Sequence, residues 1–174
     1  MSLAGCASPA QNKTIVIRWQ RLVDDKGDTC DRCGNTEQAV EEARRLLTAS
    51  LKPLGMRVQV VKTSLTEEQF KHAPSESNRI WIGDASLDKI LDAKTGDSPC
   101  CGSCGDSNCR TMVVDGQTYE AIPPELIVRA GLRVAADLVQ PASPAKNCCP
   151  SGYSPTRTSD PNLQPMPWLS QGGK

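Results

Sequence analysis

Cysteines are the residues of this chain best suited to chemistry, since nine occur among its 174 residues. Two of them form a Cys-x-x-Cys pair at Cys30 and Cys33. Four more lie within a short stretch: Cys100, Cys101, Cys104 and Cys109. These spacings suit metal sites and redox pairs better than loop-closing disulfides. Because the number of cysteines is odd, at least one cannot pair within the chain, and we expect a reducing, cytoplasmic compartment.

The Cys30/Cys33 pair lies between a predicted strand and a predicted helix. Backbone N–H groups and the positive end of the helix dipole favour a thiolate at a helix start, and Arg32 adds positive charge. Cys30 is therefore the expected nucleophile, and Cys33 could resolve a mixed disulfide. If the protein is a redox enzyme, it is a thiol-disulfide oxidoreductase with these two catalytic residues. The alternatives are that the pair supplies half of the ligands of a structural zinc site, or that both thiols are inert.

The second cluster lies on a Gly-rich segment that could wrap a soft metal. Cys101 and Cys104 have the two-residue gap of zinc sites, and Cys109 with Cys100 or with the first pair could complete four sulfurs. A redox disulfide network is the alternative, whereas the spacing matches neither common ferredoxin pattern. The predicted metal ligands are Cys30, Cys33, Cys100, Cys101, Cys104 and Cys109, with Cys148 and Cys149 as a weaker pair.

Composition excludes several other functions. Twenty basic and twenty acidic residues cancel without a basic run, which argues against nucleic acid or membrane-surface partners. No apolar stretch reaches the roughly 20 residues of a membrane span. Nucleotide-binding and zinc-hydrolase motifs are missing, so no organic cofactor is expected. The expected partners are a soft metal or metalloid ion, a thiol reductase or an oxidised protein. Residues 3–6, Leu-Ala-Gly-Cys, match a lipoprotein cleavage site, so anchoring through Cys6 is an alternative localisation if a signal segment precedes them.

The elements that would position these cysteines follow a β-α-β-α-β-β-α order. Alternating and β-branched runs predict strands at 14–23, 57–62 and 79–82, and a hairpin of 110–114 and 117–122 around Asp115-Gly116. Trp19 and Trp81 are expected in the core. Residues 95–108 are predicted as a loop.

Helices are predicted in four places. The first begins at Asn35 as N-cap and ends before Pro53, and a short one opens with a Ser64–Glu67 capping box. A helical turn is expected at 87–91, and a longer helix from 123 to 139. The domain is thus predicted to span 14–139, between a flexible segment at 1–13 and a flexible Pro-rich tail at 140–174.

The chain also resembles a bacterial family described as domain of unknown function 2703. The resemblance rests on residues 29–33, 77–82, 98–101, 104–106, 109–111 and 119–123 and covers about 15–139. It implies a thioredoxin-like α/β fold with a central mixed sheet of about four to five strands and a Cys-rich loop insertion. Thioredoxins have a cis-proline before the third strand that keeps metals from the cysteine pair. Here Ser77-Asn78 stands there, which favours metal or metalloid binding over exchange with protein substrates.

Overall fold

Two parallel strands and the helix between them form the centre of the fold: β1 (Thr14–Leu22), α1 (Asp31–Leu51) and β2 (Arg57–Leu65). The computed structural model describes residues 13–100, 104 and 107–139, all within the compact unit Met1–Gln140. The predicted terminal segments lie outside the described residues, as do the cysteines at positions 6, 101, 148 and 149.

The main sheet has the strand order β2-β1-β3-β4. β3 (Arg79–Ile82) runs antiparallel to β1 and pairs with the short β4 (Ala85–Ser86). The short helices are η1 (Lys52–Leu54) before β2, α2 (Glu67–His72) and η2 (Pro74–Glu76) between β2 and β3, and α3 (Leu87–Leu91) after β4. Because β3 is antiparallel, its first residues lie at the same edge of the sheet as the last residues of β1.

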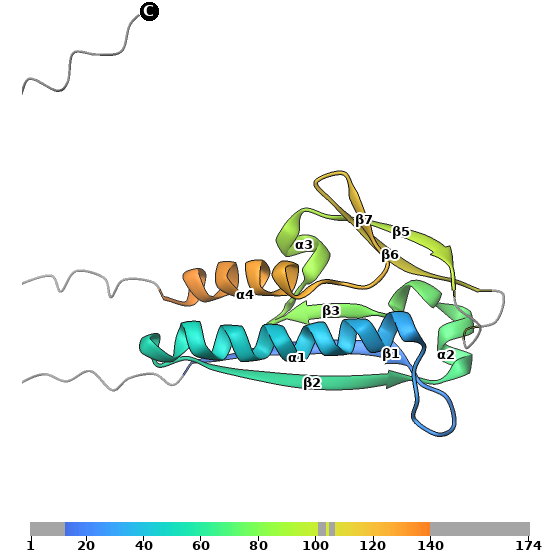
Figure 1. Cartoon of the computed structure of the whole chain (residues 1–174), viewed down its shortest axis with the longest axis horizontal. Coiled ribbons are helices and arrows are strands. Elements are labelled where there is room, and N and C mark those ends of the chain that lie inside the picture. Colours follow the sequence, from blue (N-terminus) through green and yellow to red (C-terminus); the bar gives the residue numbers. More distant parts are fainter. Residues whose placement is uncertain (1–12, 101–103, 105–106, 140–174) are drawn as a thin grey trace, which may run out of the picture. The chain divides into compact units, whose positions relative to one another are not determined.

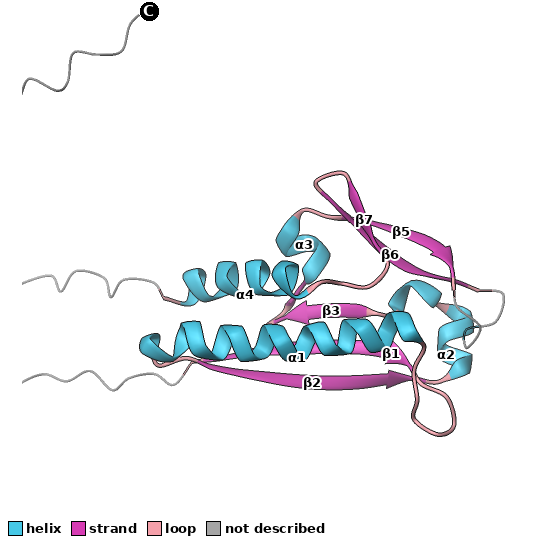
Figure 2. Cartoon of the chain, in the orientation of Figure 1, coloured by secondary structure: helices cyan, strands magenta, loops and turns pink. Residues whose placement is uncertain are grey.

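A second, antiparallel sheet contains β5 (Lys94–Pro99), β6 (Asn108–Val114) and β7 (Gln117–Tyr119) (Figure 2). The predicted hairpin turn is confirmed, since Asp115 and Gly116 both have positive φ, 52° and 82°, as a type I′ turn requires, but its second strand ends at Tyr119 and not at 122. The loop prediction was wrong for 95–99 and for 108, which belong to the paired strands β5 and β6. β5 has no apolar alternation, so its strand conformation comes from the partner strand and not from local pattern.

The core lies between the main sheet and the two longest helices, α1 and α4 (Pro124–Leu138) (Figure 1). Ile15, Ile17 and Trp19 alternate along β1 and are fully buried. The helices pack closely at Gly131, where an added Cβ would lie 2.5 Å from a methyl carbon of Leu47. An alanine at this position would therefore require the Leu47 side chain to move.

Three local predictions were wrong. α1 begins five residues earlier than the Asn35 cap predicts, with Cys30 as its N-cap residue. The capping box of α2 joins Thr66 and Gln69, because β2 continues to Leu65 and includes Ser64. Trp81 is half-buried on the other face of its strand from Ile80 and Ile82, and the guanidinium groups of Arg18 and Arg79 both lie over its ring.

The chain is an α/β protein with a mixed four-stranded sheet and a second small antiparallel sheet, which confirms the predicted fold class. Among the described residues, no helix is long and apolar enough to cross a membrane.

Candidate thiol site

The candidate site lies where β1 and β2 end and β3 begins. The loop between β1 and α1 carries Cys30 to this edge, and its polar side chains hold it closed. The hydroxyl of Thr29 donates to the carbonyl of Leu22 at 2.8 Å, and the Asp24 carboxylate accepts from the backbone N–H of Asp28 at 2.8 Å. Loops at the carboxyl ends of parallel strands are a common place for ligand sites.

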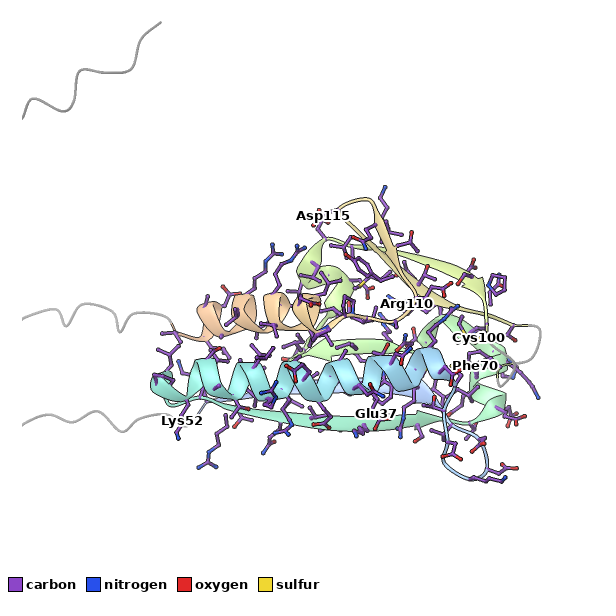
Figure 3. The ribbon with its side chains drawn as sticks, viewed as in Figure 1. Glu37, Lys52, Phe70, Cys100, Arg110 and Asp115 are labelled. Atoms are coloured by element: carbon purple, nitrogen blue, oxygen red, sulfur yellow. A yellow bond between two sulfur atoms is a disulfide. The ribbon has the colours of Figure 1, made fainter. Side chains whose placement is uncertain are left out.

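Three cysteines from distant parts of the sequence meet at this edge. The sulfur atoms of Cys30, Cys100 and Cys104 all lie within 4.8 Å of one another. Cys30 comes from the start of α1, Cys100 follows the end of β5 (Figure 3), and Cys104 comes from the segment between β5 and β6. The side chains of Cys30 and Cys104 are only 6% and 9% exposed. Cys100 is partly buried. Three sulfurs in this arrangement could hold one soft metal ion.

A cavity of about 70 Å³ adjoins two of these cysteines, Cys30 and Cys104. Carboxylate side chains line it as well: Asp24, Asp28 and Glu67. Since one water molecule occupies about 30 Å³ in the liquid, the cavity has room for an ion and a small ligand. Its acidic lining favours a cation over an anion.

Cys100, which directly follows β5, is also part of a disulfide with Cys109 of β6. Their Cα atoms are 5.1 Å apart, and Cys109 is buried in β6. In the β5–β6 ladder Cys109 pairs with Ser98, which lies two residues before Cys100. The disulfide therefore runs diagonally from one strand to the other at the end of the ladder. Cys100 can therefore belong either to the disulfide or to a set of three thiolates, but not to both at once.

Cys33 lies one helical turn beyond Cys30 and is 2% exposed. Its hydrogen bond with Cys30, then burial and then the charge of Cys30 together raise the pKa of Cys33 far above its ordinary range. Weaker hydrogen bonds with Thr29 and Ser77 act in the opposite direction. Cys33 thus keeps its proton at neutral pH and remains next to Cys30 as a hydrogen-bonded thiol.

Arg32, between the two cysteines of the pair, connects α1 to the end of β5. Its Nη2 atom donates to the carbonyl oxygen of Pro99 at 3.1 Å and lies 3.0 Å from a carboxylate oxygen of Glu120. The same carboxylate accepts a hydrogen bond from the hydroxyl of Ser98 at 2.7 Å. Since Pro99 directly precedes Cys100, Arg32 fixes the distance between the two cysteine-bearing segments.

Ser77 and Asn78 lie directly before β3, at the same edge of the sheet as the cysteine pair. The Ser77 hydroxyl lies 4.0 Å from the sulfur of Cys33 and accepts the backbone N–H of Leu22 at 3.1 Å. Asn78 has a φ of 55°, a left-handed conformation that asparagine tolerates, and its side chain accepts a hydrogen bond from Trp19 at 3.2 Å. The residues described contain no cis peptide bond.

The predicted ligands thus divide into three groups. Cys30, Cys100 and Cys104 are brought together, Cys33 adjoins Cys30, and Cys109 is in the disulfide. The remaining predicted ligands lie outside the described residues: Cys101, Cys148 and Cys149. The contact of Ser77 with Cys33 and the contacts of Arg32 with Pro99 and Glu120 could not be predicted from residue type and spacing.

The fold and this site define an α/β protein with a largely buried cluster of cysteines at one edge of a mixed sheet. By its sequence the chain belongs to the family described as Domain of unknown function (DUF2703), whose model matches residues 15–131. It is also similar to an uncharacterized protein of Archaeoglobus fulgidus, with 37% identity over 113 residues that cover 65% of this chain and 82% of the relative. No solved structure matches the chain.

Proposed function

We propose that this protein binds one soft metal or metalloid ion through the thiolates of Cys30, Cys100 and Cys104. The observation that carries this proposal is the approach of the three sulfur atoms to within 4.8 Å of one another. Thiolates prefer soft ions such as Zn²⁺ and Cu(I) over hard ions such as Mg²⁺. Three sulfur ligands suit a three-coordinate metalloid such as arsenite, or zinc with a fourth position left for another ligand.

The surroundings of the three sulfurs support a cation site. The adjoining cavity is lined by carboxylates, and Cys33 is close enough to Cys30 to act as a further sulfur donor once it loses its proton. Cys101, which directly follows Cys100 in the sequence, is the other predicted ligand that could complete a four-sulfur zinc site. Binding requires the reduced protein, because the disulfide withdraws Cys100 from the set.

We also infer that the fold is a variant of the thioredoxin type. The support is the crossover from β1 through α1 to the parallel β2, with Cys-x-x-Cys at the start of α1, followed by an antiparallel β3. The second sheet and its Cys-rich connection are the additions that carry two of the three proposed ligands, Cys100 and Cys104.

Metal content and thiol count of the same sample test the proposal. The full chain is purified without oxygen in the presence of a phosphine reductant, and bound metal is measured by elemental analysis. Thiols are then titrated before and after addition of a chelator. We expect one ion per chain and additional reactive thiols once the ion is removed. A metal-free protein whose thiols all react from the start, and which also takes up no added zinc or arsenite, would contradict it.

A zinc ion that only stabilises the loop is the alternative use of the same ligands. In that case removal of the metal would lower the melting temperature of the protein and leave no exchangeable site for other thiophilic ions. Rapid replacement of bound Zn²⁺ by Cd²⁺ or arsenite, without unfolding, is the result that the binding function predicts.

A further inference from the structure

The sulfur of Cys30 lies within 4.8 Å of a sulfur that belongs to a disulfide, that of Cys100. Disulfides exchange when a thiolate attacks one of their sulfur atoms and expels the other as a thiolate. The structure therefore places a Cys-x-x-Cys dithiol beside an internal disulfide, which is the arrangement needed for exchange within one chain.

We propose that the chain contains an internal dithiol–disulfide relay, in which the Cys30/Cys33 pair and the Cys100/Cys109 pair exchange two electrons. This inference does not depend on metal binding and extends the oxidoreductase alternative of the sequence analysis. It assigns a role to Cys109, which is not among the three sulfurs of the proposed metal site.

The first step joins the two pairs. The thiolate of Cys30 attacks the sulfur of Cys100, so the Cys30–Cys100 bond forms while the Cys100–Cys109 bond breaks. Cys109 leaves with the electron pair as a thiolate and takes up a proton. Cys100 is the attacked atom because its sulfur is the one that lies in the cluster with Cys30, whereas Cys109 lies within β6.

The second step resolves the mixed disulfide. Once Cys30 is in the mixed disulfide, the hydrogen bond and the charge of its thiolate, which hold the proton on Cys33, are gone, so Cys33 passes its proton to the departing Cys100 as it attacks the neighbouring sulfur of Cys30. The Cys30–Cys33 bond forms, the Cys30–Cys100 bond breaks, and Cys100 leaves as a thiolate and is protonated. In total the first pair is oxidised, the second pair is reduced, and two protons follow the two electrons. No external oxidant or reductant is consumed.

Two structural features favour this route. The contact of Arg32 with the carbonyl of Pro99 at 3.1 Å keeps the segment before Cys100 against the start of α1. Burial of Cys33 and Cys109, both 2% exposed, shields these two sulfurs from bulk thiols, so exchange inside the chain competes well with exchange in solution. A substrate disulfide or an external dithiol would reach the relay at Cys30, through the cavity that this residue lines.

Disulfide trapping in the full chain tests the relay in the presence of a chelator. All variants carry serine in place of the cysteines outside the two pairs, by the substitutions Cys6→Ser, Cys101→Ser, Cys104→Ser, Cys148→Ser and Cys149→Ser. In this background Cys33→Ser removes the resolving thiol. We expect the Cys30–Cys100 mixed disulfide to accumulate to a measurable fraction of the protein. Acid quenching, alkylation and peptide mass spectrometry detect it.

A matched pair of variants tests which sulfur is attacked. Adding Cys109→Ser to Cys33→Ser leaves Cys30 and Cys100, whereas adding Cys100→Ser leaves Cys30 and Cys109. On mild oxidation the first variant should form its intramolecular disulfide about tenfold faster or more. Equal rates, or no Cys30–Cys100 disulfide in a variant whose circular dichroism matches that of the parent, would overturn the relay. Metal binding by the fully reduced parent is measured separately, so failure of one proposal leaves the other intact.

Discussion

The hydroxyl oxygen of Ser77 lies 4.0 Å from the sulfur of Cys33, and both side chains are almost fully buried. Ser77 also accepts a hydrogen bond from the backbone of Leu22, the last residue of β1. A single serine therefore connects the end of the central strand, the start of β3 and the cysteine pair of α1. This is the position where the resemblance to thioredoxins would place a cis-proline.

Replacing Ser77 by alanine should lower the free energy of unfolding by about 1–3 kcal/mol, because the buried N–H of Leu22 loses its acceptor. Urea denaturation of the reduced, metal-free protein measures this change. Ser50→Ala is the matched control, since the Ser50 hydroxyl is exposed and bonds only to the carbonyl of Leu46 in its own helix. An effect of Ser77→Ala no larger than that of the control would contradict the role given to Ser77.

The raised pKa of Cys33 predicts a loss of stability at alkaline pH. Above its ordinary value of 9.0 the thiol ionises in the unfolded chain but stays protonated in the folded one, so the folded state holds more protons. The free energy of unfolding should then fall as pH rises, by up to about 1.4 kcal/mol per pH unit from this group. Denaturation from about pH 8 to about pH 10.5 should show a shallower fall for Cys33→Ala. Identical slopes for the parent and the variant would contradict the assignment.

Arg32 is expected to position Cys100 for metal binding. Arg32→Ala removes the contacts with Pro99 and Glu120, so the affinity of the reduced protein for Cd²⁺ should fall about tenfold or more. Arg32→Lys should restore little, because a lysine cannot contact both groups as a guanidinium does. Arg45→Ala is the control on the same helix, since Arg45 pairs with Glu42 on the exposed face. Similar affinities for Arg32→Ala and Arg45→Ala would show that Arg32 has no such role.

Elements with a strong local signal could be predicted from the sequence. The Asp115-Gly116 turn needs positive φ at both positions, and α4 begins at a proline pair and has a regular apolar face. By contrast, β5 has no apolar alternation and is a strand because it pairs with β6. The start of α1 was predicted too late because asparagine is a favourable N-cap residue, which pointed to Asn35. In the structure the turn held by Thr29 makes Cys30 the N-cap residue instead.

The thiol chemistry of the candidate site could be predicted from the sequence, but not which cysteines come together. Cysteine type and spacing pointed to thiol chemistry at the Cys30/Cys33 pair and at the later cluster, and left open how the two combine. The combination of Cys30 with Cys100 and Cys104 depends on the path of β5 and β6, which bring the later cluster to the start of α1. The pairing of Cys100 with Cys109 likewise follows from the register of that ladder.

The most direct test of the three-thiolate site is a Cd²⁺ titration of the reduced, metal-free chain, followed by sulfur-to-metal charge-transfer absorption. The parent should bind one ion per chain. Cys30→Ser and Cys104→Ser should weaken binding by more than the roughly 10- to 100-fold typical of losing an outer hydrogen-bond partner, since each removes a ligand. Cys109→Ser should retain tight binding in the reduced protein, because Cys109 is not one of the three ligands. Equal affinities in all four proteins would contradict the site.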